Sequence, residues 1–443
     1  MKKPFLFLLL LGVLKFANCQ QKYFQQQVNY KIDVTLDDLQ NTLNGFEIIE
    51  YTNNSPDTLH FIWFHLWPNA FKNDHTAFSE QLLQLGRTDF YFSDDNKRGY
   101  INRLDFKVNG ITSVLEDHPQ YIDVAKLILP APLAPGQTIK ITTPFHEKIP
   151  FNFSRGGHVG NSYQITQWYP KPAVYDSKGW HPMPYLDQGE FYSEFGNFNV
   201  QITLPKDYVV AATGVLQNED ELKWLKERLE LRAITNQLED KKVQIQVISD
   251  KPSTLEAGKS VKNKQRPSLQ KQKSQPLKLK PVAIPPSRQT AQKTLIYIQN
   301  NVHDFAWFAD KNYIVLHDTL ELATGQVIDA FSFFTPTGKE VWKNSIQFIK
   351  DAVRTRSGWL GEYPYNVVTA VEAKMGFDGG MEYPTITSIS PTASAKDLDE
   401  VIEHEVGHNW NYGILATNER EHPWMDEGMN TYFDNKYAKL KYP

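Results

Sequence analysis

The chain has a single cysteine, Cys19, among its 443 residues. One thiol cannot form an internal disulfide, so a disulfide-stapled scaffold is excluded. Residues after Cys19 offer no cysteine nucleophile, and they carry neither a Ser-His-Asp signature nor a phosphate-binding glycine loop. The chemistry of this chain must therefore rest on other residue types.

Long hydrophobic runs are also scarce. The apolar run Phe5–Leu14, preceded by two lysines and followed by small residues, is too short for a membrane span and is typical of an export signal. We expect a signal peptide at residues 1–19, cleaved before Gln20, with a lipid tether at Cys19 as the alternative. No later segment predicts a transmembrane helix. The expected location is the periplasm, the cell envelope or the medium, in a bacterium.

An excess of positive charge is absent as well. The net charge is −4, so binding to nucleic acid has no electrostatic support over the whole chain. The hydrophobic content of 41% is ordinary for a globular protein, and the aromatic content of 13% fits thick β-sheets or a peptide-binding cleft.

Residues 20–217 show the pattern of an N-terminal β domain. Polar and apolar residues alternate along residues 28–36, which predicts a half-buried strand, and residues 46–51 and 59–67 read as further antiparallel strands around an Asn- and Pro-containing turn. Residues 218–293 form a charged, Lys-rich, low-complexity insertion that is too poor in apolar residues to bury a core. Its two interpretations are a solvated surface loop and a basic patch for an anionic surface.

Residues 294–443 mix strand and helix patterns. Apolar residues at 342, 346, 349 and 353 predict an amphipathic helix, and residues 367–371 read as a buried strand. The predicted fold class is a multidomain α+β protein, in which an antiparallel β domain precedes a mixed α/β domain.

The segment His404-Glu-Val-Gly-His408 carries the strongest chemical signal. It lies in a helix expected to begin near Asp397, which has capping spacing to Glu400. Residues four apart share one helix face, so both imidazoles can reach one zinc ion, and Glu405 is suited to take a proton from zinc-bound water. Without a third ligand, the bland interpretation is a helix carrying two histidines bonded to other partners.

Glu427 supplies that third ligand, 18 residues beyond His408. A catalytic zinc site needs three protein ligands and one open position, so we expect one Zn²⁺ per chain held by His404, His408 and Glu427. Asp434 lies nearly under Glu427 on the same helix, either as a partner of a zinc-binding histidine or as a surface acid.

Upstream, Gly379, Gly380 and Met381 precede Glu382. The glycines let another backbone approach closely, and the segment fits a strand edge that pairs with an extended peptide. The carboxylate of Glu382 is suited to hold the free amino group of a peptide substrate. The bland interpretation is a tight turn with a surface acid.

These three segments resemble the aminopeptidase N family of zinc peptidases, which includes the leukotriene hydrolase branch. The family pattern is Gly-x-Met-Glu-Asn, then His-Glu-x-x-His, then 18 residues, then a Glu within Trp-x-x-Glu-Gly. Trp410 and the segment Trp424–Gly428 match it too. The resemblance implies a saddle-like β domain before a thermolysin-like catalytic domain at residues 294–443. It also implies Glu405 as general base, Glu382 as amine anchor, and substrate-backbone binding by the glycine segment.

Two departures qualify the resemblance. Tyr383 replaces the family Asn, which affects the pocket for the first residue. The chain also ends 16 residues after Glu427, before the family's transition-state tyrosine and helical C-terminal domain, so we expect a truncated form of a longer protein. The leading hypothesis is a zinc aminopeptidase acting on peptides. The alternative is a catalytically impaired zinc-binding fragment that only binds peptides or partners.

Overall fold

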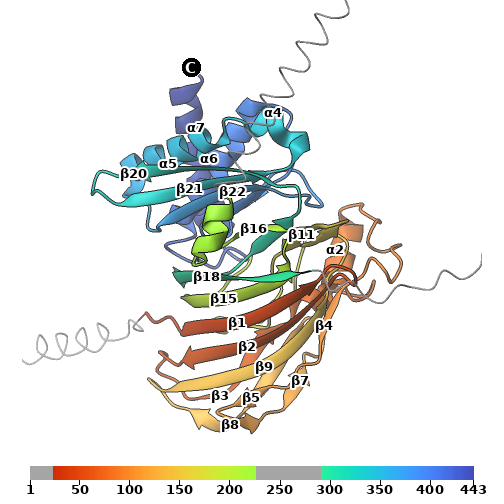
Figure 1. Ribbon diagram of the computed structural model, residues 1–443. Helices are drawn as coiled ribbons and strands as arrows, with labels where there is room; N and C mark the ends of the chain where they lie inside the picture. Colours follow the sequence, from red (N-terminus) through yellow and green to blue (C-terminus); the bar gives the residue numbers. More distant parts are fainter. Residues whose placement is uncertain (1–22, 226–290) are drawn as a thin grey trace, which may run out of the picture. The chain divides into compact units, whose positions relative to one another are not determined.

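The computed structural model describes residues 23–225 and 291–443 (Figure 1). The expected signal at residues 1–19, the alternative lipid tether at Cys19 and most of the expected insertion lie outside these described residues. In the described part, no helix combines the length and the apolar character that crossing a bilayer requires.

The first half is built mainly from antiparallel β-structure, as the sequence predicts. Its largest sheet has nine strands in the order β17-β18-β15-β1-β2-β9-β5-β6, with β4 beside β9. Its members are β1 (Gln27–Asp37), β2 (Thr42–Thr52), β4 (Tyr100–Asn102), β5 (Lys107–Val108), β6 (Ile111–Thr112), β9 (Thr138–Lys148), β15 (Gly196–Pro205), β17 (Val215–Leu216) and β18 (Gln292–Val302).

Strand β1 confirms the predicted alternation. Its buried residues are Val28, Tyr30, Ile32, Val34 and Leu36. The strand pairs antiparallel with β2 and parallel with β15, so one face of this sheet supplies a continuous part of the hydrophobic core.

Three smaller sheets and short helical segments complete the described residues of this half, and residues 219–225 begin a further helix. The sheets have the orders β12-β3-β8-β7, β10-β11-β19-β16 and β13-β14. Their strands are β3 (Leu59–His65), β7 (Leu115–Asp117), β8 (Val124–Leu133), β10 (Gly157–Val159), β11 (Ser162–Ile165), β12 (Lys171–Pro172), β13 (Tyr175–Asp176), β14 (Gly179–Trp180), β16 (Val209–Ala212) and β19 (Trp307–Asp310). Two of the helical segments are η1 (Trp67–Phe71) and α2 (Ala77–Gln84).

The expected boundary at residue 294 falls inside strand β18. Strand β18 pairs with β15 and β17, and β19 pairs with β11 and β16, so both strands belong to sheets of the first half. The change to mixed α/β structure therefore comes after residue 310.

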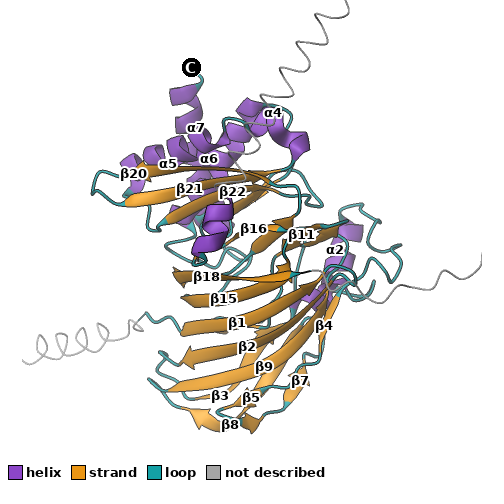
Figure 2. Ribbon diagram, in the orientation of Figure 1, coloured by secondary structure: helices purple, strands orange, loops and turns teal. Residues whose placement is uncertain are grey.

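The mixed part contains a five-stranded sheet covered by helices (Figure 2). The sheet order is β20-β21-β22-β24-β23, and helix α5 packs against β20, β21, β22 and α6. The strands are β20 (Ile314–Glu321), β21 (Val327–Phe334), β22 (Val367–Glu372), β23 (Gly380–Met381) and β24 (Ile386–Ile389). The helices are η2 (Pro336–Gly338), α4 (Lys339–Trp342), α5 (Ser345–Leu360), α6 (Ala395–Asn411), η3 (Pro423–Met425) and α7 (Glu427–Lys441).

Two local expectations are wrong. The single amphipathic helix splits, because Trp342 ends α4 and the other apolar positions lie on α5. Helix α6 begins at Ala395, earlier than expected, because the cap is Ser394, whose hydroxyl accepts a hydrogen bond from the Asp397 backbone N–H.

Candidate metal centre

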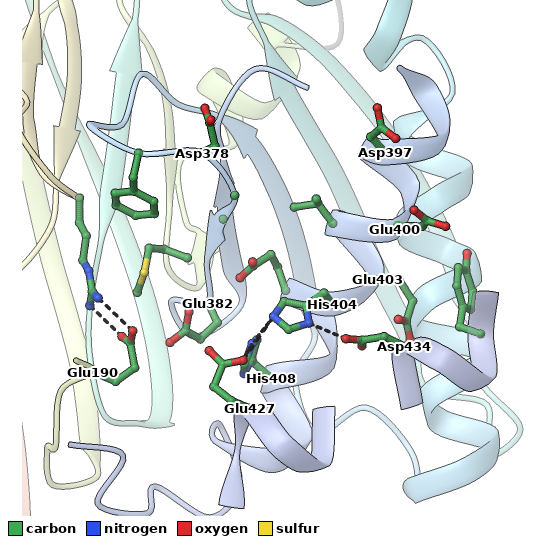
Figure 3. Close-up of a pocket in the computed structure, with 18 of the residues that line it drawn as sticks. Glu190, Asp378, Glu382, Asp397, Glu400, Glu403, His404, His408, Glu427 and Asp434 are labelled. Carbon is green, nitrogen blue, oxygen red and sulfur yellow. Dashed lines mark hydrogen bonds and ion pairs between the residues drawn. The ribbon is translucent and has the colours of Figure 1, made fainter. Parts of the chain in front are cut away.

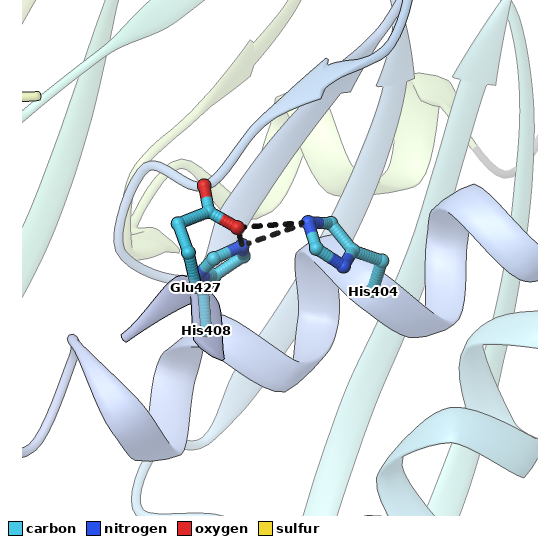
Figure 4. Close-up of side chains that lie close together, drawn as sticks. All are labelled: His404, His408 and Glu427. Atoms are coloured by element: carbon cyan, nitrogen blue, oxygen red, sulfur yellow. Dashed lines mark hydrogen bonds and ion pairs between the residues drawn. The ribbon is translucent and has the colours of Figure 1, made fainter. Parts of the chain in front are cut away.

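Helix α6 places His404 and His408 on one face, one turn apart. Their Nε2 atoms are 3.2 Å apart (Figure 4). Glu427, at the start of α7, brings Oε2 to 3.5 Å from Nε2 of His404 and 3.9 Å from Nε2 of His408. Two ligands held about 2.0–2.1 Å from a tetrahedral zinc ion are about 3.3–3.4 Å apart. This His-His-Glu cluster (His404, His408, Glu427) therefore fits one zinc ion.

Carboxylates hold the opposite nitrogen of each ring. Nδ1 of His404 lies 2.7 Å from Oδ2 of Asp434, and Nδ1 of His408 lies 2.6 Å from Oδ2 of Asp426. An ionised carboxylate only accepts, so each Nδ1 donates, and a neutral ring then presents a bare Nε2 lone pair. Two such lone pairs repel at this distance unless a cation lies between them, and carboxylate-bound histidines are characteristic of metal sites.

The same carboxylates raise the affinity of both rings for positive charge. Burial alone lowers the pKa of His404, but hydrogen bonds to Asp434 and Glu427 outweigh burial and raise that pKa to about 11. Burial acts likewise on His408, where the charge and hydrogen bond of Asp426 raise the pKa to about 10. Without a metal, the cluster would attract protons instead.

Arg356 holds the carboxylate of Asp434 in place through a hydrogen bond to Oδ1, while Oδ2 contacts His404. Its guanidinium is fully buried and donates from Nη2 to Asp434 at 2.6 Å and from Nε to Glu403 at 2.5 Å. A Cβ on Gly407 would come within 2.6 Å of Cζ of Arg356, so a glycine at this position lets the guanidinium reach beneath the histidines. The structure thus supports the first interpretation of Asp434, as a partner of a histidine in the cluster.

Glu405 lies beside the two histidines, and all three side chains line one cavity. Its side chain is buried, and its Oε2 has no hydrogen-bond partner in the described residues. Burial raises the pKa of Glu405 to about 7, although the two histidines act to lower it. A Cβ on Gly380 would lie 2.4 Å from this carboxyl, so only glycine there leaves room for Glu405.

The glycine segment forms a strand edge, as expected. Strand β23, Gly380–Met381, pairs with β24 on one side, at the end of the sheet order. Gly379 has φ 111°, a conformation that favours glycine. Gly379, Gly380 and Met381 line the cavity, so an extended chain in the cavity could pair with the free edge of β23.

Glu382 follows that edge and faces other acids. One oxygen each of Glu190, Glu382 and Glu419 lie within 4.8 Å of one another. Burial, and next the charge of Glu190, raise the pKa of Glu382 well above its ordinary value. Tyr383, which stands where the family pattern has Asn, is buried. Its hydroxyl donates a hydrogen bond to Oε1 of Gln167 at 3.2 Å.

A cavity of about 670 Å³ unites these groups (Figure 3). It is lined by the residues expected for the metal, the base, the amine and the backbone: His404, His408, Glu427, Glu405, Glu382, Gly379, Gly380 and Met381. Sequence reasoning missed Asp426, Glu190 and Glu419. Only Asp426 carried a signal, as the neighbour of a candidate ligand.

The comparisons with known proteins divide between short and long matches. No protein-family model matches the chain. Over 62 residues the chain is 37% identical to leucine aminopeptidase 2 of Aspergillus oryzae, and over 60 residues it is 37% identical to leucine aminopeptidase 2-1 of Meyerozyma guilliermondii. These segments are 14% and 13% of this chain and span a tenth of each relative's length.

The structural matches extend over nearly the whole chain. The M1 zinc metallopeptidase from Deinococcus radiodurans aligns with a TM-score of 0.54 at 15% identity, covering 94% of this chain and 72% of that one. A mutant of the same enzyme bound to a Tyr-Ser-Ala substrate aligns with a TM-score of 0.53, covering 95% and 72%. The chain has the fold of the M1 zinc metallopeptidases, which confirms at the level of the fold the resemblance read from the motifs.

Proposed function

We propose that this chain is a zinc-dependent aminopeptidase that removes N-terminal residues from peptides. One observation carries the proposal. Two imidazoles, each held at Nδ1 by a carboxylate, converge with Glu427 on a point that fits one zinc ion. Beside it lies the carboxyl of Glu405, whose Oε2 has no hydrogen-bond partner among the described residues. The M1 zinc metallopeptidase fold and the leucine aminopeptidase matches support it.

His404, His408 and Glu427 would hold the zinc in the lining of the cavity, where the Glu427 side chain is 44% exposed. A bound zinc ion would polarise the scissile carbonyl and acidify water. Glu405 accepts the proton of the attacking water and delivers it to the leaving amine. A pKa near 7 suits both transfers at neutral pH, and charge from a bound metal would lower it.

Cleavage at an N-terminus follows from Glu382. Strand β23 pairs with the substrate backbone, and Glu382 next to it binds the free α-ammonium, which sets the register. An internal peptide unit would place an uncharged amide against this acidic group, so endopeptidase action is disfavoured. The Deinococcus enzyme binds a Tyr-Ser-Ala substrate, which supports a peptide as the substrate class.

Export is a second, separate part of the proposal, supported by the N-terminal sequence pattern. The N-terminal mass of the protein purified from its host tests it. A chain starting at Gln20 supports cleavage of the signal, a lipid adduct on Cys19 supports the tether, and an intact signal contradicts both.

The test of the activity is hydrolysis of aminoacyl-amide fluorogenic substrates by the metal-free and the zinc-loaded protein. Glu405→Gln keeps the size of the side chain but removes the base. Zinc-dependent hydrolysis that falls at least about 100-fold in this variant, with zinc content unchanged, supports the proposal. Zinc binding without hydrolysis would instead favour the non-catalytic alternative.

A further inference from the structure

A second cavity, of about 790 Å³, shares no lining residue with the cavity at the metal centre. Its walls come from strands β17 and β18, from residues 364–366 before β22 and from residues 413 and 414 after α6. None of its lining residues is charged, whereas ten carboxylates and one arginine line the catalytic cavity. An ionic ligand would find no opposite charge in the second cavity, so this cavity suits a neutral ligand.

Primary amides supply most of the polar groups in this amide-lined cavity. Six lining residues carry one: Gln25, Gln217, Gln299, Asn300, Asn301 and Asn366. Among the described residues, Asn300 and Asn301 form hydrogen bonds only through their backbones, so both side-chain amides are available to a ligand. An amide group both donates and accepts hydrogen bonds, as a hydroxyl group does. The polar lining therefore matches a ligand that carries many hydroxyl groups.

A β-bulge places two of these amides side by side. Where β18 pairs with β15, the register shifts so that residues 300 and 301 both lie opposite Asn197. Asn301 has φ 53°, and its backbone N–H donates to Oδ1 of Asn197 at 3.2 Å. Successive side chains of a regular strand point to opposite faces, and a bulge changes where they point. Because of the bulge, the neighbours Asn300 and Asn301 both line the cavity.

The backbone of the lining already has hydrogen-bond partners from side chains. Amide or hydroxyl groups of the protein donate, over 2.8 to 3.1 Å, to the carbonyl oxygens of Val215, Asn300, Tyr365 and Gly413. An extended peptide that adds to a strand edge needs open backbone groups along that edge. Recognition in the amide-lined cavity therefore depends on side chains, which favours a hydroxyl-rich ligand over an extended peptide.

We propose that the amide-lined cavity binds a neutral oligosaccharide. The hydroxyl groups of a sugar ring donate and accept as the amides do, and the ring has an apolar C–H face. That face matches the apolar part of the lining, which consists of Phe195, Val215, Ile298, Pro364, Tyr365 and Ile414. The volume lies in the range of small-molecule sites, which suits a di- or trisaccharide.

Three aromatic rings separate the amide-lined cavity from the acidic groups beside the metal centre. The ring of Phe195, which lines the amide-lined cavity, lies 6.0 Å from the ring of His303. The ring of His303 lies 4.0 Å from that of Tyr412, and both line the small cavity beside Glu382. The oligosaccharide is therefore a ligand distinct from the peptide substrate, and its binding does not require zinc.

The test measures binding by isothermal titration calorimetry to the zinc-loaded and the metal-free protein. The neutral probes are chitotriose, cellotriose and maltotriose. The charged probe is trigalacturonic acid, and the peptide probe is trialanine blocked at both ends. The variants are Asn300→Ala and Asn366→Ala, both at exposed positions. The control is Asn102→Ala on β4, an exposed Asn of the same sheet as Asn300 that does not line the cavity.

We expect at least one neutral trisaccharide to bind with a Kd of about 1 mM or lower, and the charged and peptide probes to bind at least about 10-fold more weakly. Asn300→Ala and Asn366→Ala each weaken binding of that trisaccharide about 10-fold, because each removes one or two hydrogen bonds. Asn102→Ala leaves the Kd unchanged. The metal-free protein binds as tightly as the zinc-loaded protein, and Asn300→Ala keeps the zinc content of the wild type.

The proposal is overturned if none of the three neutral trisaccharides binds, if both variants bind as the wild type does, or if the charged or peptide probe binds as tightly as the neutral sugars. Loss of binding on removal of zinc overturns it as well, because the sugar would then occupy the catalytic cavity. The proposal is independent of the proposed function, since absence of zinc-dependent hydrolysis would leave the expected sugar binding unchanged.

Discussion

Replacing Asp426 by Asn tests how the buried carboxylate contributes to the metal site. Asn keeps the size of the side chain and one acceptor oxygen for Nδ1 of His408, but it removes the negative charge. Asp426 and His408 are each only 1% exposed at the side chain, so solvent does not screen their 2.6 Å contact. A hydrogen bond to a charged group contributes about 1.5–3 kcal/mol, which corresponds to about 10- to 100-fold in zinc affinity.

The assay is competition for zinc between the protein and a chromogenic chelator at fixed pH. The matched comparison is Asp434→Asn at His404, where the side chains are 26% and 27% exposed and solvent screening is greater. We expect a smaller loss of affinity there, together with a lower melting temperature, because Arg356 loses a charged partner.

The reasoning is refuted if folded Asp426→Asn protein binds zinc within about twofold of the wild type, since a fully buried charged contact would then contribute nothing. It is also refuted if Asp434→Asn is the more damaging change for zinc affinity. Exposed Asp397 provides the control, because Asp397→Asn should leave the affinity unchanged.

Two further predictions concern other residues. Gly380→Ala puts a methyl group 2.4 Å from the Glu405 carboxyl, so kcat should fall at least about 10-fold at unchanged zinc content, and a kcat equal to the wild type's would contradict the close approach. Burial raises the pKa of Asp123 from 3.8 to about 7, so the folded state binds this proton more tightly and loses stability as pH rises through that window. Relative to the wild type, Asp123→Asn should therefore gain up to about 4 kcal/mol in unfolding free energy between about pH 4 and about pH 8, measured by urea denaturation, and a constant difference would contradict it.

The parts predictable from sequence are those with local periodicity or fixed spacing. The alternation along β1 places its apolar side chains in the core regardless of which strands pair with it. One helix places His404 and His408, four residues apart, on the same face. These two metal ligands could therefore be predicted without knowing which elements pack against that helix.

The site residues that could not be predicted are brought together by contacts between residues far apart in the sequence. Glu190 and Glu419 lie on two loops that Arg420 joins by a hydrogen bond, and no periodicity marks either acid. The domain boundary escaped for a similar reason. The pattern of residues 294–302 predicts a strand, but only its pairing with β15 shows to which sheet that strand belongs.

Strand β18 has a consequence for how freely the chain length between β17 and β18 can vary. Leu216 pairs with Tyr297, and the backbone N–H of Gln217 donates to the carbonyl oxygen of Ile296 at 2.8 Å, so the chain leaves this sheet and returns to it at one point. The register of the sheet therefore does not depend on how many residues lie between. In general, each doubling of a loop's length costs only about 0.6 kcal/mol in closure entropy. The connection between β17 and β18 should therefore tolerate insertions, deletions or the new termini of a circularly permuted chain, without displacing the residues of the metal centre.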